Sequence, residues 1–280
     1  KGTDVELDYL GENVATAAQA EAARDAYLSA LDRMASAGPR GHVSLKLTQM
    51  GLDAGESICA ENVEAVLSRA EETGSFVWID MEGSGYVDST IDVYDRALSS
   101  HRNVGIALQA YLYRTKADLA YVVARGGTVR LCKGAYSEPP SIAYPAKADV
   151  DASYMALEER LLSSGRFHAL ATHDERMIRH AVDYAREHGI PRDSFEFQML
   201  YGVRRDLQDR LLSEGYRLRV YVPYGLEWYP YFMRRLAERP ANLLFLLGSL
   251  LREGGGRRPE TSKREGATHH ESTGVGDSAR

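Results

Sequence analysis

The sequence predicts an α/β protein folded as a (β/α)8 barrel of the TIM type. Short segments rich in apolar and β-branched residues recur along the chain, and helical patterns separate them. Eight such strand–helix units in about 250 residues are typical of this barrel. An open doubly wound sheet is the alternative. No G-x-G-x-x-G follows the first strand, so the dinucleotide-binding form of that fold lacks its signature.

The predicted strands and helices alternate from the start of the chain. The strands are Val5–Leu10, His42–Leu47, Phe76–Met81, Val104–Gln109, Thr128–Lys133, Phe167–Thr172, Ser194–Met199 and Arg217–Val222. The helices between them are Ala17–Ala37, Glu61–Thr73, Val87–Ser100, Lys116–Arg125, Ala152–Ser164, Arg176–Glu187 and Arg205–Glu214. Gly74, Gly189 and Gly215 stand where helix C-caps are expected.

The last patterned segment continues from the eighth strand through an aromatic loop into a further helix. There Tyr231, Arg234, Arg235 and Glu238 follow three- and four-residue spacings, so they lie on neighbouring rows of one helix face. Two adjacent guanidinium groups beside tyrosines suit a small carboxylate, because each planar fork can donate two parallel hydrogen bonds. A solvated Arg-Arg pair on an outer helix is the alternative interpretation.

Two irregular stretches interrupt this pattern. Residues 136–149 contain three prolines after the fifth strand, which predicts an active-site loop. From Glu253 the chain is polar and aperiodic, so we predict one barrel domain over residues 1–252 and a disordered tail over 253–280.

Composition restricts the class of partner. The net charge is −6 and no Lys/Arg-rich run interrupts the pattern, which argues against nucleic acid. Two cysteines, Cys59 and Cys132, indicate a reducing compartment rather than a disulfide framework. The sequence contains no apolar run of about 18 residues, so no membrane span is predicted. The first residues also lack a signal-peptide pattern.

Polar side chains gather where the strands end, and barrels of this class place their chemistry at the carboxyl ends of the strands. These side chains are Glu12, Lys46, Asp80, Glu82, Gln109, Arg130, Lys133, Thr172, His173, Gln198 and Tyr221. Polar loops alone would supply some of them. Lys46 and Asp80 lie on the second and third strands, which should be neighbours, and we favour a pair that orients substrate over a structural ion pair at the rim.

The motifs of metal and acyl-transfer enzymes are absent. The chain has no H-E-x-x-H, C-x-x-C or G-x-S-x-G, so His173 is better read as a hydrogen-bond donor to a phosphate or cofactor. Arg130 is expected to point into the barrel mouth, and Cys132 to be a small buried hydrophobe. Gly134 would let the backbone approach a flat ligand.

Together, several segments resemble the proline dehydrogenase family, most closely its short bacterial members. They are Asp8–Glu12, Ser44–Gln49, Ile79–Glu82, Leu108–Arg114, Arg130–Tyr136, Ala171–His173, Phe195–Arg204 and Tyr221–Glu238. The resemblance implies a distorted (β/α)8 barrel that binds FAD without a covalent bond. It further implies oxidation of L-proline to Δ1-pyrroline-5-carboxylate, the first step of proline degradation to glutamate. A hydride equivalent would pass from proline C5 to flavin N5.

The resemblance also implies partners and a location. Electrons would pass to a membrane quinone, so the protein would be cytoplasmic and able to lie at the inner face of the cell membrane. A pyrroline-5-carboxylate dehydrogenase would use the product.

Residue roles follow from the same resemblance. The implied catalytic set is Lys46, Asp80, Arg130 and Tyr221, with Arg130 near flavin N5. The implied substrate contacts are Lys46, Tyr136, Leu200, Tyr221, Tyr231, Arg234 and Arg235, the last two clamping the carboxylate. The implied cofactor contacts are Gln109, Arg130, Cys132, Gly134, Lys147, Thr172, His173, Gln198 and Glu238, with Lys147 in the proline-containing loop. Glu12 would pair with Arg234 as a gate.

The chain departs from the family pattern in two places. It starts close to the first strand, so the helices that usually precede the barrel are missing from it, and Cys132 stands where an aliphatic residue is common. Two other functions remain open: a flavin-independent lyase or hydrolase acting on a small carboxylate, and a catalytically silent binding barrel. The combined presence of Lys46, Asp80, Arg130, Arg234 and Arg235 argues against the silent barrel.

Overall fold

The computed structural model describes residues 2–11, 13–38 and 41–225. Eight parallel strands close into a barrel in sequence order, and β8 pairs with β1. The strands are β1 Asp4–Tyr9, β2 His42–Leu45, β3 Phe76–Ile79, β4 Val104–Gln109, β5 Thr128–Cys132, β6 His168–Ala171, β7 Phe195–Leu200 and β8 Arg217–Tyr224. The predicted fold class is confirmed, and each strand lies close to its predicted position.

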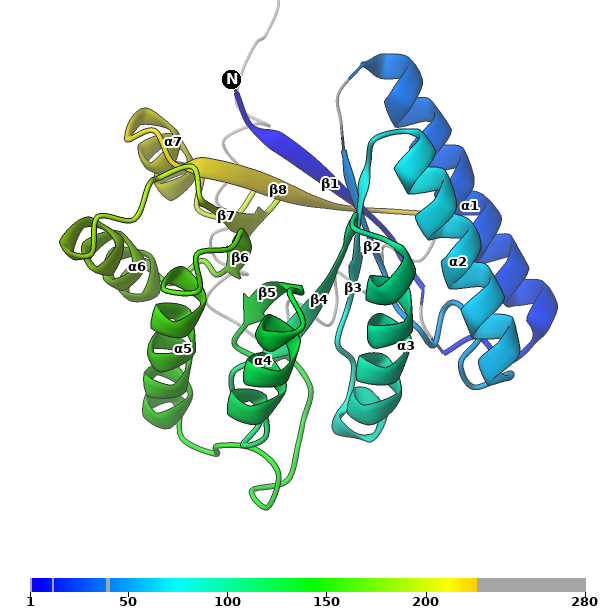
Figure 1. The fold of residues 1–280 in the computed structure, drawn as a ribbon, viewed down its shortest axis with the longest axis horizontal. Helices are drawn as coiled ribbons and strands as arrows, with labels where there is room; N and C mark the ends of the chain where they lie inside the picture. Colours follow the sequence, from blue (N-terminus) through cyan, green and yellow to red (C-terminus); the bar gives the residue numbers. More distant parts are fainter. Residues whose placement is uncertain (1, 12, 39–40, 226–280) are drawn as a thin grey trace, which may run out of the picture. The chain divides into compact units, whose positions relative to one another are not determined.

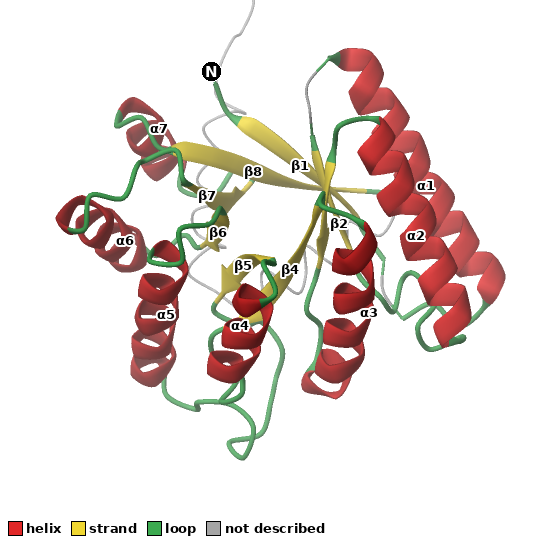
Figure 2. Ribbon diagram, viewed as in Figure 1, coloured by secondary structure: helices red, strands yellow, loops and turns green. Residues whose placement is uncertain are grey.

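Helices follow the strands and lie around the outside of the barrel from α1 to α7 (Figure 1; Figure 2). They are α1 Ala17–Ala37, α2 Glu56–Glu72, α3 Val87–Ser100, α4 Thr115–Ala124, α5 Lys147–Leu162, α6 Glu175–Glu187 and α7 Arg205–Ser213, with a 3-10 turn η1 at Ser84–Tyr86. Among the sequence predictions, Glu12, Tyr231, Arg234, Arg235, Glu238 and the tail 253–280 lie outside the described residues.

Helices α2 and α5 begin earlier than predicted, at Glu56 and Lys147. Each has an acidic residue in its first turn, which stabilises a helix amino terminus through its dipole. In α5, Lys147 also pairs with Asp151 one turn later. The prediction that Lys147 lies in the loop was therefore wrong, and the irregular stretch is shorter than expected.

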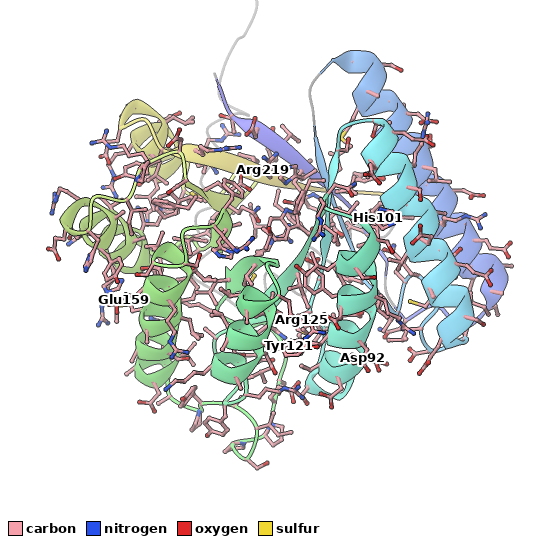
Figure 3. All side chains as sticks on the ribbon, viewed as in Figure 1. Asp92, His101, Tyr121, Arg125, Glu159 and Arg219 are labelled. Atoms are coloured by element: carbon pink, nitrogen blue, oxygen red, sulfur yellow. The ribbon has the colours of Figure 1, made fainter. Side chains whose placement is uncertain are left out.

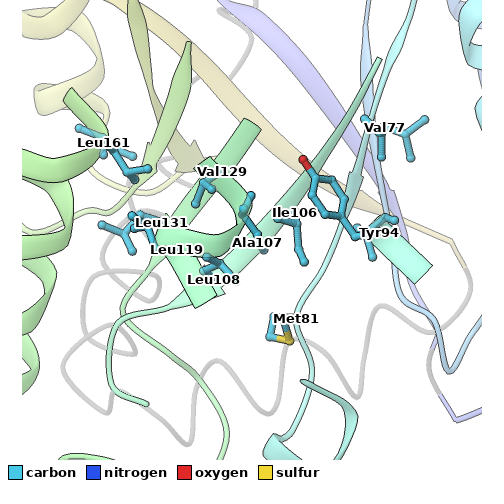
Figure 4. Close-up of a cluster of buried hydrophobic side chains, with 14 of the residues drawn as sticks. Val77, Met81, Tyr94, Ile106, Ala107, Leu108, Leu119, Val129, Leu131 and Leu161 are labelled. Carbon is cyan, nitrogen blue, oxygen red and sulfur yellow. The ribbon is translucent and has the colours of Figure 1, made fainter. Parts of the chain in front are cut away.

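The apolar core lies between the barrel wall and the helices (Figure 4). Val77, Ile106 and Val129 on successive strands are fully or almost fully buried, and Tyr94 and Leu119 of the outer helices belong to the same cluster. Because successive side chains of a strand point to opposite faces, the alternate residues point into the barrel. The helices therefore cover the outer face only.

The inside of the barrel is polar rather than filled by bulky aliphatic residues. Glu6 and Asp8 of β1, Arg130 of β5 and Arg219 of β8 are all buried. Trp78 of β3 fills part of the space, and a Cβ added at Gly105 on β4 would lie 2.4 Å from its ring. Here the absent side chain of the glycine makes room for the indole. The interior thus brings charged groups from distant strands together.

One ion-pair network closes the amino-terminal half of the barrel. Arg219 donates from Nε and Nη2 to the two carboxylate oxygens of Glu196, at 2.9 and 3.1 Å. Its Nη1 donates to the Val5 carbonyl at 3.2 Å, and its Nη2 lies 3.3 Å from Asp4 Oδ2. Figure 3 labels Arg219 among the strands of the barrel. Every guanidinium nitrogen of Arg219 is satisfied within the protein.

A hollow of about 580 Å³ lies beside this network at the amino ends of the strands, where Asp4, His42 and Arg217 contribute to its lining. The predicted site is at the opposite end of the barrel. Within residues 2–11, 13–38 and 41–225, no helix is both long enough and apolar enough to cross a bilayer.

Candidate active site

Arg130 is the centre of a charged cluster in the carboxyl half of the barrel. Its Nη1 donates to Ser44 Oγ and to Asp80 Oδ1, both at 2.8 Å. Its Nη2 donates to Glu6 Oε1, and its guanidinium carbon lies 4.6 Å from the centre of the Trp78 ring. Burial disfavours the charged form, but Glu6 and Asp80 outweigh it and raise the pKa of Arg130. Arg130 is thus a permanently cationic group inside the barrel.

Lys46 lies between two carboxylates at the same end. Its Nζ is 3.2 Å from Asp8 Oδ1 and 3.6 Å from Asp80 Oδ2. Burial again works against the charge, but both carboxylates raise the pKa of the ammonium group. The sequence-based pairing of Lys46 with Asp80 therefore has a geometric basis. Asp80 also accepts a hydrogen bond from Arg130, however, and Asp8 is the nearer partner of Lys46.

Glu6, Asp8 and Ser44 also belong to this cluster, although they are not among the site residues predicted from the sequence. Glu6 and Asp8 are 0% and 1% exposed, and the Ser44 hydroxyl donates to Glu6 Oε1. The signal was present in the first strand, where acidic residues alternate with apolar ones. In a barrel whose outer face packs under helices, the acidic row of such a strand points inward.

The cluster is not closed. Among the described residues, no acceptor meets Arg130 Nε, and Asp8 Oδ2 and the Tyr111 hydroxyl are also buried without a hydrogen-bond partner. An unpaired buried polar group costs about 1–3 kcal/mol, so such groups in a native site indicate a ligand, water or ion. The carboxyl end of the barrel can therefore bind a polar ligand.

Predicted substrate-contact residues line this same end. Tyr221 on β8 is in register with Leu200 on β7, and both are half-buried. The Tyr221 ring centre lies 5.9 Å from the guanidinium carbon of Arg130. Tyr136, in the loop after β5, is 37% exposed. Two of the predicted wall residues thus lie side by side near Arg130.

Two predicted cofactor-contact glutamines already make hydrogen bonds within the protein. Gln109 Nε2 donates to the Glu82 carbonyl at 2.9 Å, and its Oε1 accepts from the Ala135 amide at 3.4 Å. Gln198 Nε2 donates to Glu196 Oε1 at 2.7 Å. Each amide group keeps a second hydrogen and a second lone pair, so these bonds orient the side chains without saturating them.

Thr172 and His173 follow β6 as predicted. Thr172 Oγ1 accepts from the Asp174 amide at 3.1 Å. His173 Nε2 lies 2.8 Å from the backbone nitrogen of Leu200, which donates to it. A neutral imidazole that accepts at Nε2 carries its hydrogen on Nδ1, so His173 is set up to donate from Nδ1.

Two predictions near β5, for Cys132 and Lys147, need correction. Cys132 is half-buried, not buried, because it ends the strand at the barrel rim. At Gly134, with φ of 121°, an added Cβ would lie 2.2 Å from the Tyr111 ring, so only glycine fits beside this side chain. Lys147 begins α5, pairs with Asp151 and has a 72% exposed side chain.

A second ion-pair network holds this part of the rim. Lys133 after β5 contacts Asp151 of α5 and, at 2.7 Å, Asp174 before α6. Lys147 lies 3.6 Å from the same Asp174 carboxylate. In the described part of the chain, no group of three or more His, Cys, Asp or Glu side chains is arranged to hold a metal ion.

The chain is similar to known proteins along most of its length. A family profile described as "Proline dehydrogenase" matches residues 1–247. Proline dehydrogenase 2 of Bacillus subtilis is 42% identical over 245 residues, which is 88% of this chain and 81% of that protein. The Deinococcus radiodurans proline dehydrogenase is 41% identical over 251 residues, with the same shares of 88% and 81%.

A solved structure shares the fold. The crystal structure of proline utilization A from Bdellovibrio bacteriovorus, inactivated by N-propargylglycine, matches with a TM-score of 0.78 and 26% identity. The match covers 84% of this chain but only 30% of that much longer one.

Proposed function

The chain belongs to the proline dehydrogenase family, and on that premise we propose that it is an FAD-dependent enzyme that oxidises L-proline to Δ1-pyrroline-5-carboxylate. A hydride equivalent leaves ring carbon C5, and the product continues toward glutamate. The observation that carries this proposal is the buried charged cluster around Arg130, at the end of the barrel where enzymes of this fold hold their substrates.

The residues at this end fit a flavin. Arg130 Nε is a buried donor without an acceptor among the described residues, and an acceptor atom of the flavin ring would satisfy it. FAD, when bound, supplies the oxidant that the side chains of this protein lack. We assign its contacts to Gln109, Arg130, Cys132, Gly134, Lys147, Thr172, His173, Gln198 and Glu238. A cation at Arg130 favours the negatively charged reduced ring.

The protein side chains bind and orient the substrate. Arg234 and Arg235 clamp the proline carboxylate through charge-assisted hydrogen bonds, and Glu12 pairs with Arg234 to close the pocket. The pyrrolidine ring is enclosed by Tyr136, Leu200, Tyr221 and Tyr231, which exclude water from the reacting carbon. Lys46 and Asp80 form an ion pair beside the substrate. None of these groups needs to act as a nucleophile.

We further propose that the electrons pass to a membrane quinone and that the protein meets the inner face of the cell membrane for this step. A pyrroline-5-carboxylate dehydrogenase would take up the product. The support is the family alone. Proline-dependent reduction of a soluble quinone analogue, with and without added lipid vesicles, tests both points.

The absorption spectrum of the purified protein tests the proposed reaction. The FAD-loaded protein should be yellow and should bleach when L-proline is added without oxygen, whereas D-proline should bleach it far less. A protein that takes up FAD but is never bleached by L-proline would refute the proposal. A protein that refuses FAD yet binds small carboxylates would favour a flavin-independent lyase or hydrolase.

The two arginines of the clamp give a separate prediction. Arg234→Met or Arg235→Met should raise KM for proline by roughly 10- to 150-fold, because each loses charge-assisted bonds worth about 1.5–3 kcal/mol. Steady-state kinetics checks this. Arg205→Met is a matched control, because Arg205 also follows an arginine but is exposed on α7. Normal proline binding by either clamp variant would contradict the clamp assignment.

A further inference from the structure

Arg130 is held in a single pose by groups from the first three strands. Glu6 of β1, Ser44 of β2 and Asp80 after β3 accept hydrogen bonds from its two terminal nitrogens. The Trp78 ring lies under its guanidinium carbon at 4.6 Å. Only Nε is left without a partner among the described residues. These contacts therefore decide which donor Arg130 presents to a ligand.

Glu6 is the deepest part of this arrangement. It precedes Asp8 by one inward-facing position, which places it about 7 Å further from the carboxyl end of the strand. Its side chain is 0% exposed and lies opposite His42 on β2 and Tyr221 on β8. Ser44 connects it to Arg130, because the serine hydroxyl donates to Glu6 Oε1 and accepts from Arg130 Nη1. Glu6, Ser44 and Arg130 thus form a closed ring of hydrogen bonds.

Stability does not explain a carboxylate at this position. Burial raises the pKa of Glu6, opposed by Arg130 and the Ser44 hydroxyl, so ionising it there carries a desolvation cost. Replacing a buried ion pair by well-packed apolar residues is often neutral or stabilising. The cluster also holds three carboxylates, of Glu6, Asp8 and Asp80, against the two cations of Lys46 and Arg130. Glu6 is the carboxylate that bonds Arg130 but lies away from the mouth.

We propose that Glu6 is a positioning residue for proline oxidation. Through Ser44 and Arg130 Nη2 it fixes the guanidinium group, so that Nε is the donor left for the flavin, and its charge tunes the flavin midpoint potential. This inference rests on the proposed function and deepens it. Glu6 acts through Arg130 and does not touch substrate.

Glu6→Gln tests the proposal, because glutamine keeps the shape and the acceptor oxygen but removes the charge. In the FAD-loaded variant, we expect the flavin midpoint potential to rise, since one negative charge near the ring is lost. We also expect kcat to fall between about tenfold and a hundredfold because the guanidinium is less well fixed, while KM changes less than about threefold. Unchanged potential and unchanged kcat would overturn the proposal.

Two further variants keep the test decisive. Glu158→Gln removes another fully buried carboxylate, one that bonds His180 of α6 outside the barrel at 2.7 Å. It should lower the unfolding temperature without moving the flavin potential; an equal shift of potential would show that Glu6→Gln reports only general damage. If Glu6→Gln does not fold, Ser44→Ala breaks the same ring and should lower kcat, and a wild-type kcat in Ser44→Ala would overturn the proposal.

The wild-type protein separates this inference from the proposed function. If L-proline never bleaches its flavin, the proposed function fails. If the wild type bleaches and Glu6→Gln matches it in kcat and potential, only the positioning role fails.

Discussion

Arg219 and Arg130 are both buried inside the barrel, but their hydrogen bonds differ. All three nitrogens of Arg219 have acceptors within the protein, and Glu196 meets two of them as a bidentate partner. Arg130 is equally surrounded on its terminal nitrogens, yet its Nε has no acceptor among the described residues. Arg219 lies in the amino-terminal half of the barrel and Arg130 nearer the strand ends that form the site.

We propose that this difference distinguishes a structural arginine, Arg219, from one that is arranged to bind a ligand, Arg130. A fully paired guanidinium can stabilise only the protein that pairs it. A guanidinium that is fixed on one side and unsatisfied on the other is prepared for a ligand. Variants of the two arginines should therefore differ, in stability at Arg219 and in catalysis at Arg130, and equal effects would contradict the distinction.

The largest effect is expected at Arg219, whose guanidinium nitrogens all have acceptors within the protein. Arg219→Met would leave Glu196 buried without its bidentate partner, so the free energy of unfolding should fall by about 3–5 kcal/mol. Urea denaturation of the FAD-free protein measures this. A loss below about 1 kcal/mol would show that the Arg219 network is not structural.

At Arg130 the effect should be on catalysis. Arg130→Lys keeps a cation for Glu6 and Asp80 but loses the forked donors, so kcat should fall about 100-fold or more. Stopped-flow reduction of the flavin by L-proline follows the affected step. A kcat within about threefold of wild type would place Arg130 with Arg219 as a structural residue.

A substitution at Gly134, at the carboxyl end of the barrel, should have a smaller effect. Gly134→Ala forces a methyl group toward the Tyr111 ring at a φ of 121°, so we expect a loss of about 1–3 kcal/mol in unfolding free energy. Thermal unfolding with and without FAD checks it, and FAD affinity should fall with it. Gly202→Ala is a matched control, because its φ is 79° and nothing lies within 4 Å of an added Cβ.

A buried histidine, His168, should make the free energy of unfolding depend on pH. His168 Nδ1 accepts from the Val129 amide at 3.1 Å, and burial lowers the pKa of His168 to about 4. Between that value and the ordinary value of 6.5 the unfolded chain binds a proton that the folded chain does not. Stability should therefore fall by about 1.4 kcal/mol per pH unit as pH drops through this window. Urea titrations of wild type and His168→Asn should diverge there, and parallel curves would contradict the assignment.

The sequence predicted the barrel well because each strand is a short apolar run and each helix has its own period. It also predicted that Lys46, Asp80 and Arg130 lie toward the carboxyl ends of the strands, where the structure brings them together. It missed Glu6 and Asp8 because an alternating acidic strand ordinarily has one face in water, and only closure of the sheet turns that face inward. It misplaced the start of α5, and with it Lys147, because the pair of Lys147 with Asp151 is only a weak local signal of where a helix begins.

The flavin midpoint potential, compared between Arg130→Lys and Arg219→Lys, tests the central distinction most directly. We predict a lower potential in Arg130→Lys, because the reduced ring loses a fixed donor, and a wild-type potential in Arg219→Lys. Equal shifts in the two variants, or a shift in Arg219→Lys alone, would contradict it.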